Sequence, residues 1–415
     1  MVLILVFITG YLFIALEAIT KINKAGIALL MSAILWMVSF QVDPYDATAA
    51  LSKHLSDASE ILFFLLGAMT IVELIDAHQG FDVVTRFLNY NNKKTLAWLI
   101  ALLAFFLSAL LDNLTTTIVM VTIIRKIIPD KIDRQLLTGL TVIASNAGGA
   151  WSPVGDVTTT MLWIGGQISP YGVIIHVFVP SLICLIVPTI IISRALNGSL
   201  IPILPNSGKN KAISRQNTVL SAGIVVLFTV PVIKQLTGLP PYMGMLFGLG
   251  FMWILLEWLD RRKDENERSK FTVERALQRI DTPSILFFLG ILLSIGALEY
   301  HGTLHQVATS LKTTLPNDKA LVVSMGILSA ILDNVPLVAA VQGMFDLQTW
   351  PPDSFNWYLL AFTSGTGGSI LVIGSAAGVA AMGLEDVNFG WYLKKISLPA
   401  LFGFLAGCTY FLLVG

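Results

Sequence analysis

The sequence is poor in charge. Only 13% of its 415 residues are Asp, Glu, Lys or Arg, about half of the roughly 25% found in soluble domains. The 26 basic and 26 acidic residues cancel, so the chain lacks the strong overall field that attracts nucleic acid. The low charge excludes an ordinary soluble protein, and the charge balance predicts that nucleic acid is not a partner.

Cysteine is nearly absent as well. The two cysteines, Cys184 and Cys408, both lie in apolar stretches, which excludes a disulfide framework and a cysteine-based metal site. The Ser-His-Asp, HExxH and phosphate-loop patterns of common enzymes are missing too. We therefore expect neither an enzyme nor a bound cofactor.

Apolar residues, by contrast, make up 55% of the chain, and a helix needs about 20 mostly apolar residues to cross a bilayer. The first apolar stretch lacks the basic region and cleavage site of a signal peptide, so we expect it to be a retained span. The sequence predicts an all-α polytopic membrane protein with apolar stretches at 1–19, 25–41, 59–75, 95–124, 136–165, 171–193, 217–235, 241–259, 283–298, 320–345, 356–383 and 390–413.

Basic residues predict the orientation, because Lys and Arg in short loops stay on the cytoplasmic side. All but four of the 26 Lys and Arg residues can lie inside if two stretches, 95–128 and 319–346, enter the membrane and return. They then form re-entrant helical hairpins, the first open to the cytoplasm and the second to the outside, and both termini are external. The alternative that each stretch is a full span, with the charge rule failing locally, stays open.

The two halves of the chain resemble each other. Residues 107–113 (LSALLDN) and 328–334 (LSAILDN) are identical at six of seven positions, and 145–156 (SNAGGAWSPVGD) aligns with 364–375 (SGTGGSILVIGS). Each unit has five crossings and a hairpin, and since five is odd the second copy must be inverted, as in secondary transporters. We place the first repeat at 1–195 with a discontinuous helix at 136–165, a cytoplasmic linker at 196–216, and the second repeat at 217–415 with a discontinuous helix at 356–383.

Three aspartates lie at the interruptions of these apolar stretches: Asp112, Asp156 and Asp333. An ionisable residue inside a membrane segment is costly and marks a functional site, and interrupted helix is tolerated only where it is buried in protein or lines a wet cavity. If the hairpin tips meet the discontinuous helices, the three carboxylates face one cavity. Such hard oxygen ligands suit Na⁺ or Li⁺ and repel an anion.

Alternatives remain for several of these residues. The two aspartates at the hairpin tips also stand where a helix N-cap is expected, and a cap leaves carboxylate lone pairs free for a cation. Asp156 aligns with Ser375, so the acidic set is not duplicated. The hydroxyls of Thr158, Thr159 and Thr160 either complete a cation shell or bond to backbone carbonyls. For Glu73 a position at the cavity or at the cytoplasmic mouth stays open, and for His78 and His301 either simple solvation or a role as a proton sensor stays open.

The motif SALLDNLTTTIVM (108–120), followed by SNAGGAWSPVGD and echoed by SAILDN and SGTGG, resembles the NhaD-type sodium/proton antiporters of the ion transporter superfamily, which also contains arsenite-permease and dicarboxylate-transporter branches. The resemblance covers nearly the whole chain. It implies a homodimer in which hairpins and discontinuous helices form a transport domain that moves against a scaffold of outer spans, so the two domains interleave in sequence. By motif position it implies a cation and proton site at Asp112, Asn113, Asn146, Asp156, Thr158, Thr159, Ser329, Asp333, Asn334 and Ser364.

The second copy departs from the first where Pro336 and Val338 replace hydroxyl residues and Gly365 replaces Asn146, so the halves are not expected to ligate a cation equally. Burial disfavours a charged carboxylate and a nearby cation favours it, so Na⁺ and H⁺ compete for one site. We therefore expect an antiporter that exchanges cytoplasmic Na⁺, and also Li⁺, for external H⁺ in the inner (plasma) membrane of the cell. The alternative is a coupled transporter of a small oxyanion or dicarboxylate on the same fold.

Overall fold

A computed structural model describes residues 2–15, 17–80, 92–196, 198, 210–261, 272–315 and 317–414. Its elements are α-helices joined by turns, which confirms the predicted all-α class. Within these ranges seven helices are long and apolar enough to cross a membrane, as expected for a multi-pass membrane protein. They are α3 (Lys24–Val42), α4 (Pro44–Ala77), α10 (Pro170–Ala195), α11 (Asn210–Thr237), α12 (Pro241–Asp260), α15 (Thr282–Tyr300) and α22 (Ser397–Val414).

Eight further helices come in pairs separated by short breaks. The breaks fall at the polar interruptions expected from the sequence, close to residues 109–112, 151–156, 329–333 and 368–375. The pairs are α6 (Lys93–Ser108) with α7 (Asn113–Ile127), α8 (Lys131–Ala150) with α9 (Val157–Ile164), α17 (Asp318–Leu328) with α18 (Asn334–Met344), and α19 (Phe355–Gly367) with α20 (Ala376–Glu385). The re-entrant course of two of these pairs stays a prediction.

The remaining helices are short: α1 (Val2–Ala15), α2 (Glu17–Thr20), α14 (Val273–Arg279), α16 (Thr303–Thr314) and α21 (Phe389–Lys395). The first predicted span, 1–19, contains α1 and most of α2, and residue 16 between them lies outside the described residues. Helix α11 begins at Asn210, inside the predicted linker 196–216. Most of that linker lies outside the described residues. Residues 81–91 and 262–271, which include several of the basic residues used to predict the orientation, also lie outside them.

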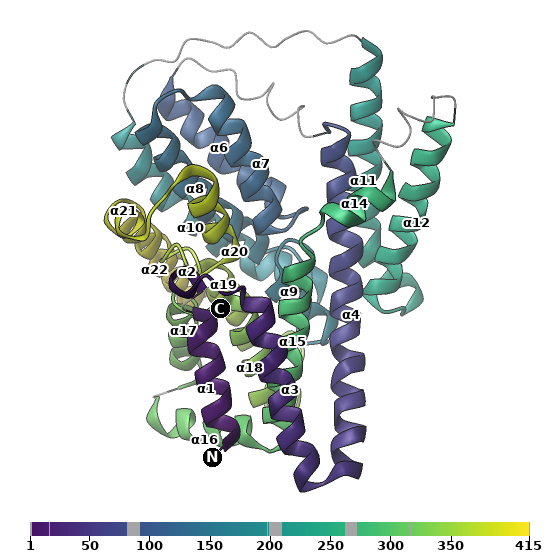
Figure 1. Cartoon of the computed structure of the whole chain (residues 1–415). Helices are drawn as coiled ribbons and strands as arrows, with labels where there is room; N and C mark the ends of the chain where they lie inside the picture. Colours follow the sequence, from purple (N-terminus) through teal and green to yellow (C-terminus); the bar gives the residue numbers. More distant parts are fainter. Residues whose placement is uncertain are drawn as a thin grey trace.

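The long helices and the paired helices pack into two bundles. In the first bundle α3 packs on α15 and α4 on α12, joined by α1, α11 and α14. In the second bundle α6 and α7 pack on α8, α17 packs on α19, and α10 packs on α22. Figure 1 shows α4, α11 and α12 on one side of the molecule and α6, α7, α8 and α10 on the other. The bundles meet where α15 contacts α18 and α4 contacts α9.

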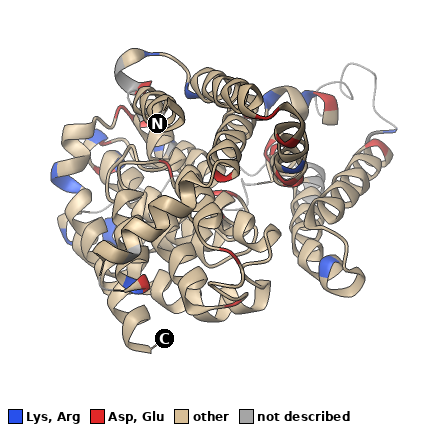
Figure 2. Cartoon of the chain, turned by 90° about the horizontal axis from the view of Figure 1, so that it is seen from below, with Lys and Arg blue, Asp and Glu red and all other residues tan. Residues whose placement is uncertain are grey.

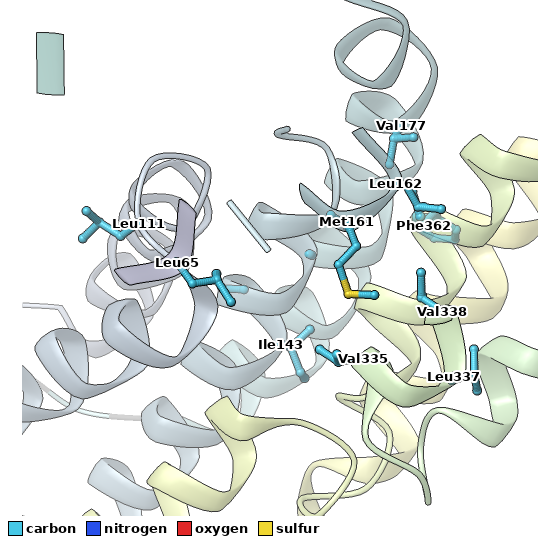
Figure 3. Packing of buried hydrophobic residues seen from close by; sticks show 14 of the residues in the cluster. Leu65, Leu111, Ile143, Met161, Leu162, Val177, Val335, Leu337, Val338 and Phe362 are labelled. Carbon is cyan, nitrogen blue, oxygen red and sulfur yellow. The ribbon is translucent and has the colours of Figure 1, made fainter. Parts of the chain in front are cut away.

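Apolar side chains fill the space between these helices. One cluster of buried residues runs through both bundles and includes Leu65 of α4, Ile143 of α8, Met161 of α9 and Val335 of α18 (Figure 3). Charged residues are sparse along the ribbons (Figure 2). Apolar burial is non-directional, so it does not fix how two helices cross. Close contacts between helix backbones help to fix each crossing.

Two glycines provide such contacts at equivalent places in the two halves. A Cβ on Gly148 of α8 would lie 2.1 Å from the carbonyl oxygen of Phe105 in α6, and a Cβ on Gly367 of α19 would lie 2.0 Å from the carbonyl oxygen of Gly326 in α17. Only glycine permits this approach of two backbones. The same helix crossing is therefore built twice.

A serine pair repeats the pattern. The hydroxyl of Ser108 donates to the Ser145 carbonyl at 2.6 Å, and the hydroxyl of Ser329 donates to the Ser364 carbonyl at 2.9 Å. Each bond ties the end of the first paired helix to the discontinuous helix beside it. The two bonds hold the break after α6 beside α8 and the break after α17 beside α19.

Candidate functional site

Asp156 is the most enclosed of the three predicted aspartates, with 2% of its surface exposed. It stands immediately before α9, at the N-cap, but its side chain makes no capping bond. Its Oδ1 instead accepts from Asn113 Nδ2 at 3.2 Å. Its Oδ2 accepts from the Thr158 hydroxyl and from Asn334 Nδ2, the latter at 3.3 Å. The carboxylate is thus turned toward residues of both halves of the chain.

The amide of Asn146 extends this arrangement. Asn113 Nδ2 donates to Asn146 Oδ1 at 2.9 Å, and Asn146 Nδ2 donates to the hydroxyls of Ser369 and Ser375, each at 2.9 Å. All members are buried. We call the set the Asp156 network; it comprises Asn113, Asn146, Asp156, Thr158, Asn334, Ser369 and Ser375.

Four helices begin at this network: α20 begins directly after Ser375, and the other three begin beside the Asp156 carboxylate. Asn113 is the first residue of α7, Asn334 is the first residue of α18, and Asp156 directly precedes α9. The N-terminus of a helix carries partial positive charge. The three termini therefore stabilise the ionised form of the Asp156 carboxylate, in a region where the described residues place no Lys or Arg in contact with it.

The two hairpin-tip aspartates lie outside the network. Asp112 caps α7, accepting from the amide nitrogen and the hydroxyl of Thr115, each at 2.7 Å. Asp333 caps α18 through the Val335 amide at 3.4 Å and also accepts from Lys24 Nζ at 2.9 Å. The capping alternative is confirmed for both.

The three carboxylates consequently do not meet in one cluster. Among the residues that the structure describes, no three acidic, histidine or cysteine side chains are close enough to hold a metal ion together. The carboxylates of Asp112 and Asp333 are instead bound by Thr115 and Lys24, and a cavity shared by all three carboxylates stays a prediction.

Asp112 faces the boundary between the two bundles. It lines a cavity of about 20 Å³ together with Leu65 of α4, Leu111, Val154 and Thr160, which is room for about one water molecule. Each hairpin tip therefore turns its Asn toward the network and its Asp toward the first bundle.

The predicted hydroxyl residues divide between carboxylate and backbone. Thr158 binds Asp156, whereas the Thr159 hydroxyl donates to the Ala150 carbonyl at 3.2 Å and the Thr160 hydroxyl to the Pro153 carbonyl at 2.9 Å. The backbone alternative thus applies to two of the three threonines. The Ser329 hydroxyl donates to the Ser364 carbonyl, and the Ser364 hydroxyl donates to the Leu360 carbonyl of its own helix, so neither hydroxyl reaches Asp156.

The unequal halves have a structural counterpart at Gly365. A Cβ on Gly365 would lie 3.4 Å from Asp156 Oδ2, whereas Asn146, its repeat partner, binds Ser375, the repeat partner of Asp156. The amide of Asn146 in the first half thus faces Ser375 of the second half. Gly365 of the second half leaves space beside the Asp156 carboxylate of the first half.

The residues whose roles the sequence left open lie in other contacts. Arg279 Nη1 donates to Glu73 Oε1 at 3.5 Å, His78 Nδ1 is 2.8 Å from the Leu74 carbonyl, and His301 Nε2 is 2.9 Å from the Ser39 hydroxyl.

Sequence reasoning missed three residues: Lys24, Ser369 and Ser375. Lys24 counted only as a cytoplasmic charge, and Ser375 only as the place where an acid is lacking. For the two serines, polar character at an interruption was the available signal, whereas Lys24 lies between two apolar stretches; in neither case does the sequence say which way the side chain points.

The sequence is similar to one protein family and to several individual proteins. Residues 11–367 match the family model described as a citrate transporter (CitMHS). The chain is 50% identical to sodium/proton antiporter 1 of Arabidopsis thaliana, over 99% of this chain and 72% of that protein. It is 47% identical to sodium/proton antiporter 2 of the same plant, over 99% and 98%. It is 31% identical to the Na⁺/H⁺ antiporter NhaD of Vibrio cholerae, over 92% and 84%.

Proposed function

The chain belongs to the citrate transporter family, and from this membership and its antiporter relatives we propose that it works as a Na⁺/H⁺ antiporter, a transporter rather than an enzyme, that exchanges cytoplasmic Na⁺ or Li⁺ for external H⁺. One observation carries the assignment to a site. Asp156 is a buried carboxylate that gathers donors from both halves of the chain and has no cationic partner among the described residues. Asp156 is therefore the residue that holds either Na⁺ or a proton.

The neighbouring residues complete the cation shell. Carboxylate, amide and hydroxyl oxygens are the hard ligands that a small cation prefers, and Asn113, Asn334 and Thr158 already touch the Asp156 carboxylate. When Na⁺ enters, Asn334 turns its amide oxygen toward the ion, while Asn146 keeps the Asn113 amide in place. Asp112 and Asp333 flank this site; Asp112 adds negative charge beside it, whereas the charge of Asp333 is paired with Lys24.

Exchange follows from competition. A buried carboxylate is costly when ionised and alone, so the site crosses the membrane when it holds Na⁺ or H⁺ and stays when it is empty. Alternating access then couples the two ions without a second transport site. The negative charge of Asp156 would repel an anion. A small oxyanion or dicarboxylate is therefore the less favoured substrate, despite the partial positive charge of the helix N-termini.

The movement that we propose is an elevator-like displacement of the second bundle against the first. The two serine bonds and the two glycine crossings recur at equivalent positions in the two halves, which supports inverted repeats with a re-entrant hairpin at 95–128 and another at 319–346. We further propose that the protein is a homodimer whose contacts lie on the first bundle, and that it resides in the inner (plasma) membrane.

The test uses the purified chain in proteoliposomes that contain a pH-sensitive dye. Added NaCl or LiCl should move protons, while KCl and citrate should not, and Asp156→Asn should abolish the Na⁺ response. Proton movement driven by citrate but not by NaCl would favour the anion transporter instead.

A further inference from the structure

Lys24 opens α3, where Asn23 caps the helix by accepting from the Ala25 amide at 2.8 Å. Its ammonium group does not turn away from the protein. Lys24 Nζ donates to Asp333 Oδ2 at 2.9 Å, and the two side chains are only 22% and 14% exposed. The ammonium also lies 4.3 Å from the centre of the Phe287 ring on α15. Lys24 is thus held by the first bundle against the tip of α18 in the second.

The two hairpin tips differ in charge although their sequences are nearly identical. Asp112, in LSALLDN, accepts from the neutral Thr115 and makes no ion pair within the described part of the chain. Asp333, in LSAILDN, is neutralised by an ammonium group. The sequence repeat therefore conceals a difference of one positive charge between two equivalent positions.

The position of this charge matters for the transported ion. Asp333 is followed directly by Asn334, whose amide donates to Asp156 at 3.3 Å. Two adjacent residues at the start of α18 thus make these contacts: Asp333 binds Lys24, and Asn334 binds the Asp156 carboxylate. A partly buried carboxylate next to a cation site attracts a second cation, and a lysine tethered to the same protein fills that place at a high effective concentration.

Resting on the proposed function, we propose that Lys24 occupies a second cation position at Asp333, so that each protomer binds one Na⁺, at the Asp156 network, rather than two. Lys24 is a specificity-determining residue in this account: it fixes how many ions the site takes. Two other carboxylates lie near it: Glu17 of α2 accepts from the Lys24 backbone amide at 3.0 Å, and Asp281 caps α15 by accepting from Ser284, so the ammonium pairs with Asp333.

Equilibrium binding of radioactive Na⁺ to the purified full-length chain at alkaline pH tests this. The wild type and Lys24→Arg should bind one Na⁺ per protomer, because arginine keeps the charge. Lys24→Met should bind two, because Asp333 is then free, and the double variant Lys24→Met with Asp333→Asn should return to one. A folded Lys24→Met protein that binds one Na⁺ overturns the proposal.

Asp333→Asn gives an independent measurement if Lys24→Met does not fold. It leaves the ammonium unpaired beside the network and should weaken Na⁺ binding about tenfold, through repulsion over a distance of roughly 10 Å at an effective dielectric constant of about 20. Unchanged Na⁺ affinity in Asp333→Asn overturns the proposal as well. The proposed function fails separately: Asp156→Asn would then bind Na⁺ as the wild type does, whatever Lys24 does.

Discussion

Replacing Asp156 by asparagine removes one negative charge at nearly constant volume. A carboxylate about 2.4 Å from Na⁺ contributes roughly 7 kcal/mol of attraction at an effective dielectric constant of about 20. If dehydration of the ion offsets two thirds of this, about 2 kcal/mol remains, which corresponds to at least a roughly 30-fold loss of affinity. The fold should persist, because the new amide breaks one hydrogen bond, at a cost of about 1–3 kcal/mol.

The geometry explains why one hydrogen bond is lost. Asn113 donates to one Asp156 oxygen and Asn334 to the other, so the NH₂ group of an asparagine placed there faces a donor in either orientation. The double variant Asp156→Asn with Asn334→Asp moves the charge to the side chain that was 3.3 Å away and should recover part of the Na⁺ affinity.

The assay is the Na⁺ concentration for half-maximal proton movement in proteoliposomes. Asp130→Asn is a matched control, since Asp130 is an exposed N-cap of α8 outside the network and asparagine caps helices equally well. Full Na⁺-driven proton movement in Asp156→Asn, at wild-type affinity, would refute the assignment of the ion site.

Two further predictions concern the fold. Cysteines introduced at Lys131 and Asn317 should react with an impermeant reagent from opposite sides of the membrane, because in the proposed topology the first hairpin opens inward and the second outward; reaction from the same side would contradict the inverted arrangement. Gly148→Ala should lower the free energy of unfolding by about 1–3 kcal/mol, measured by thermal melting in detergent, because its Cβ would lie 2.1 Å from the Phe105 carbonyl oxygen. The control Gly250→Ala meets open space and should leave the melting temperature unchanged or slightly raised; equal effects of both alanines would show that the α6–α8 crossing can relax.

The helices and their breaks could be predicted from composition alone. A run of about 20 apolar residues has few stable alternatives to a membrane helix, and Asp-Asn or Gly-Pro positions inside such a run interrupt it for local reasons. The exception was also local. Helix α11 begins seven residues earlier than the apolar stretch at 217–235 indicated.

The candidate site was predicted only in part. Asn113, Asn146, Asp156, Thr158 and Asn334 do meet, because polar residues at four interruptions have no other place to be buried. Asp112 and Asp333 were grouped with them because they are also acidic and adjacent in sequence to the asparagines. Neighbouring residues at a helix start point in different directions, so adjacency in the sequence did not imply a shared cavity.

The sequence by itself determined which segments form long apolar helices and which polar residues lie at the breaks, since both depend on the local cost of burying charge and backbone in lipid. Only the tertiary structure decided that Lys24 pairs with Asp333, rather than with Asp112 or Asp156. Lys24 and Asp333 are 309 residues apart, and their pairing depends on how α3 packs against the tip of α18. Long-range electrostatic partners follow from packing geometry, and no local pattern encodes that geometry.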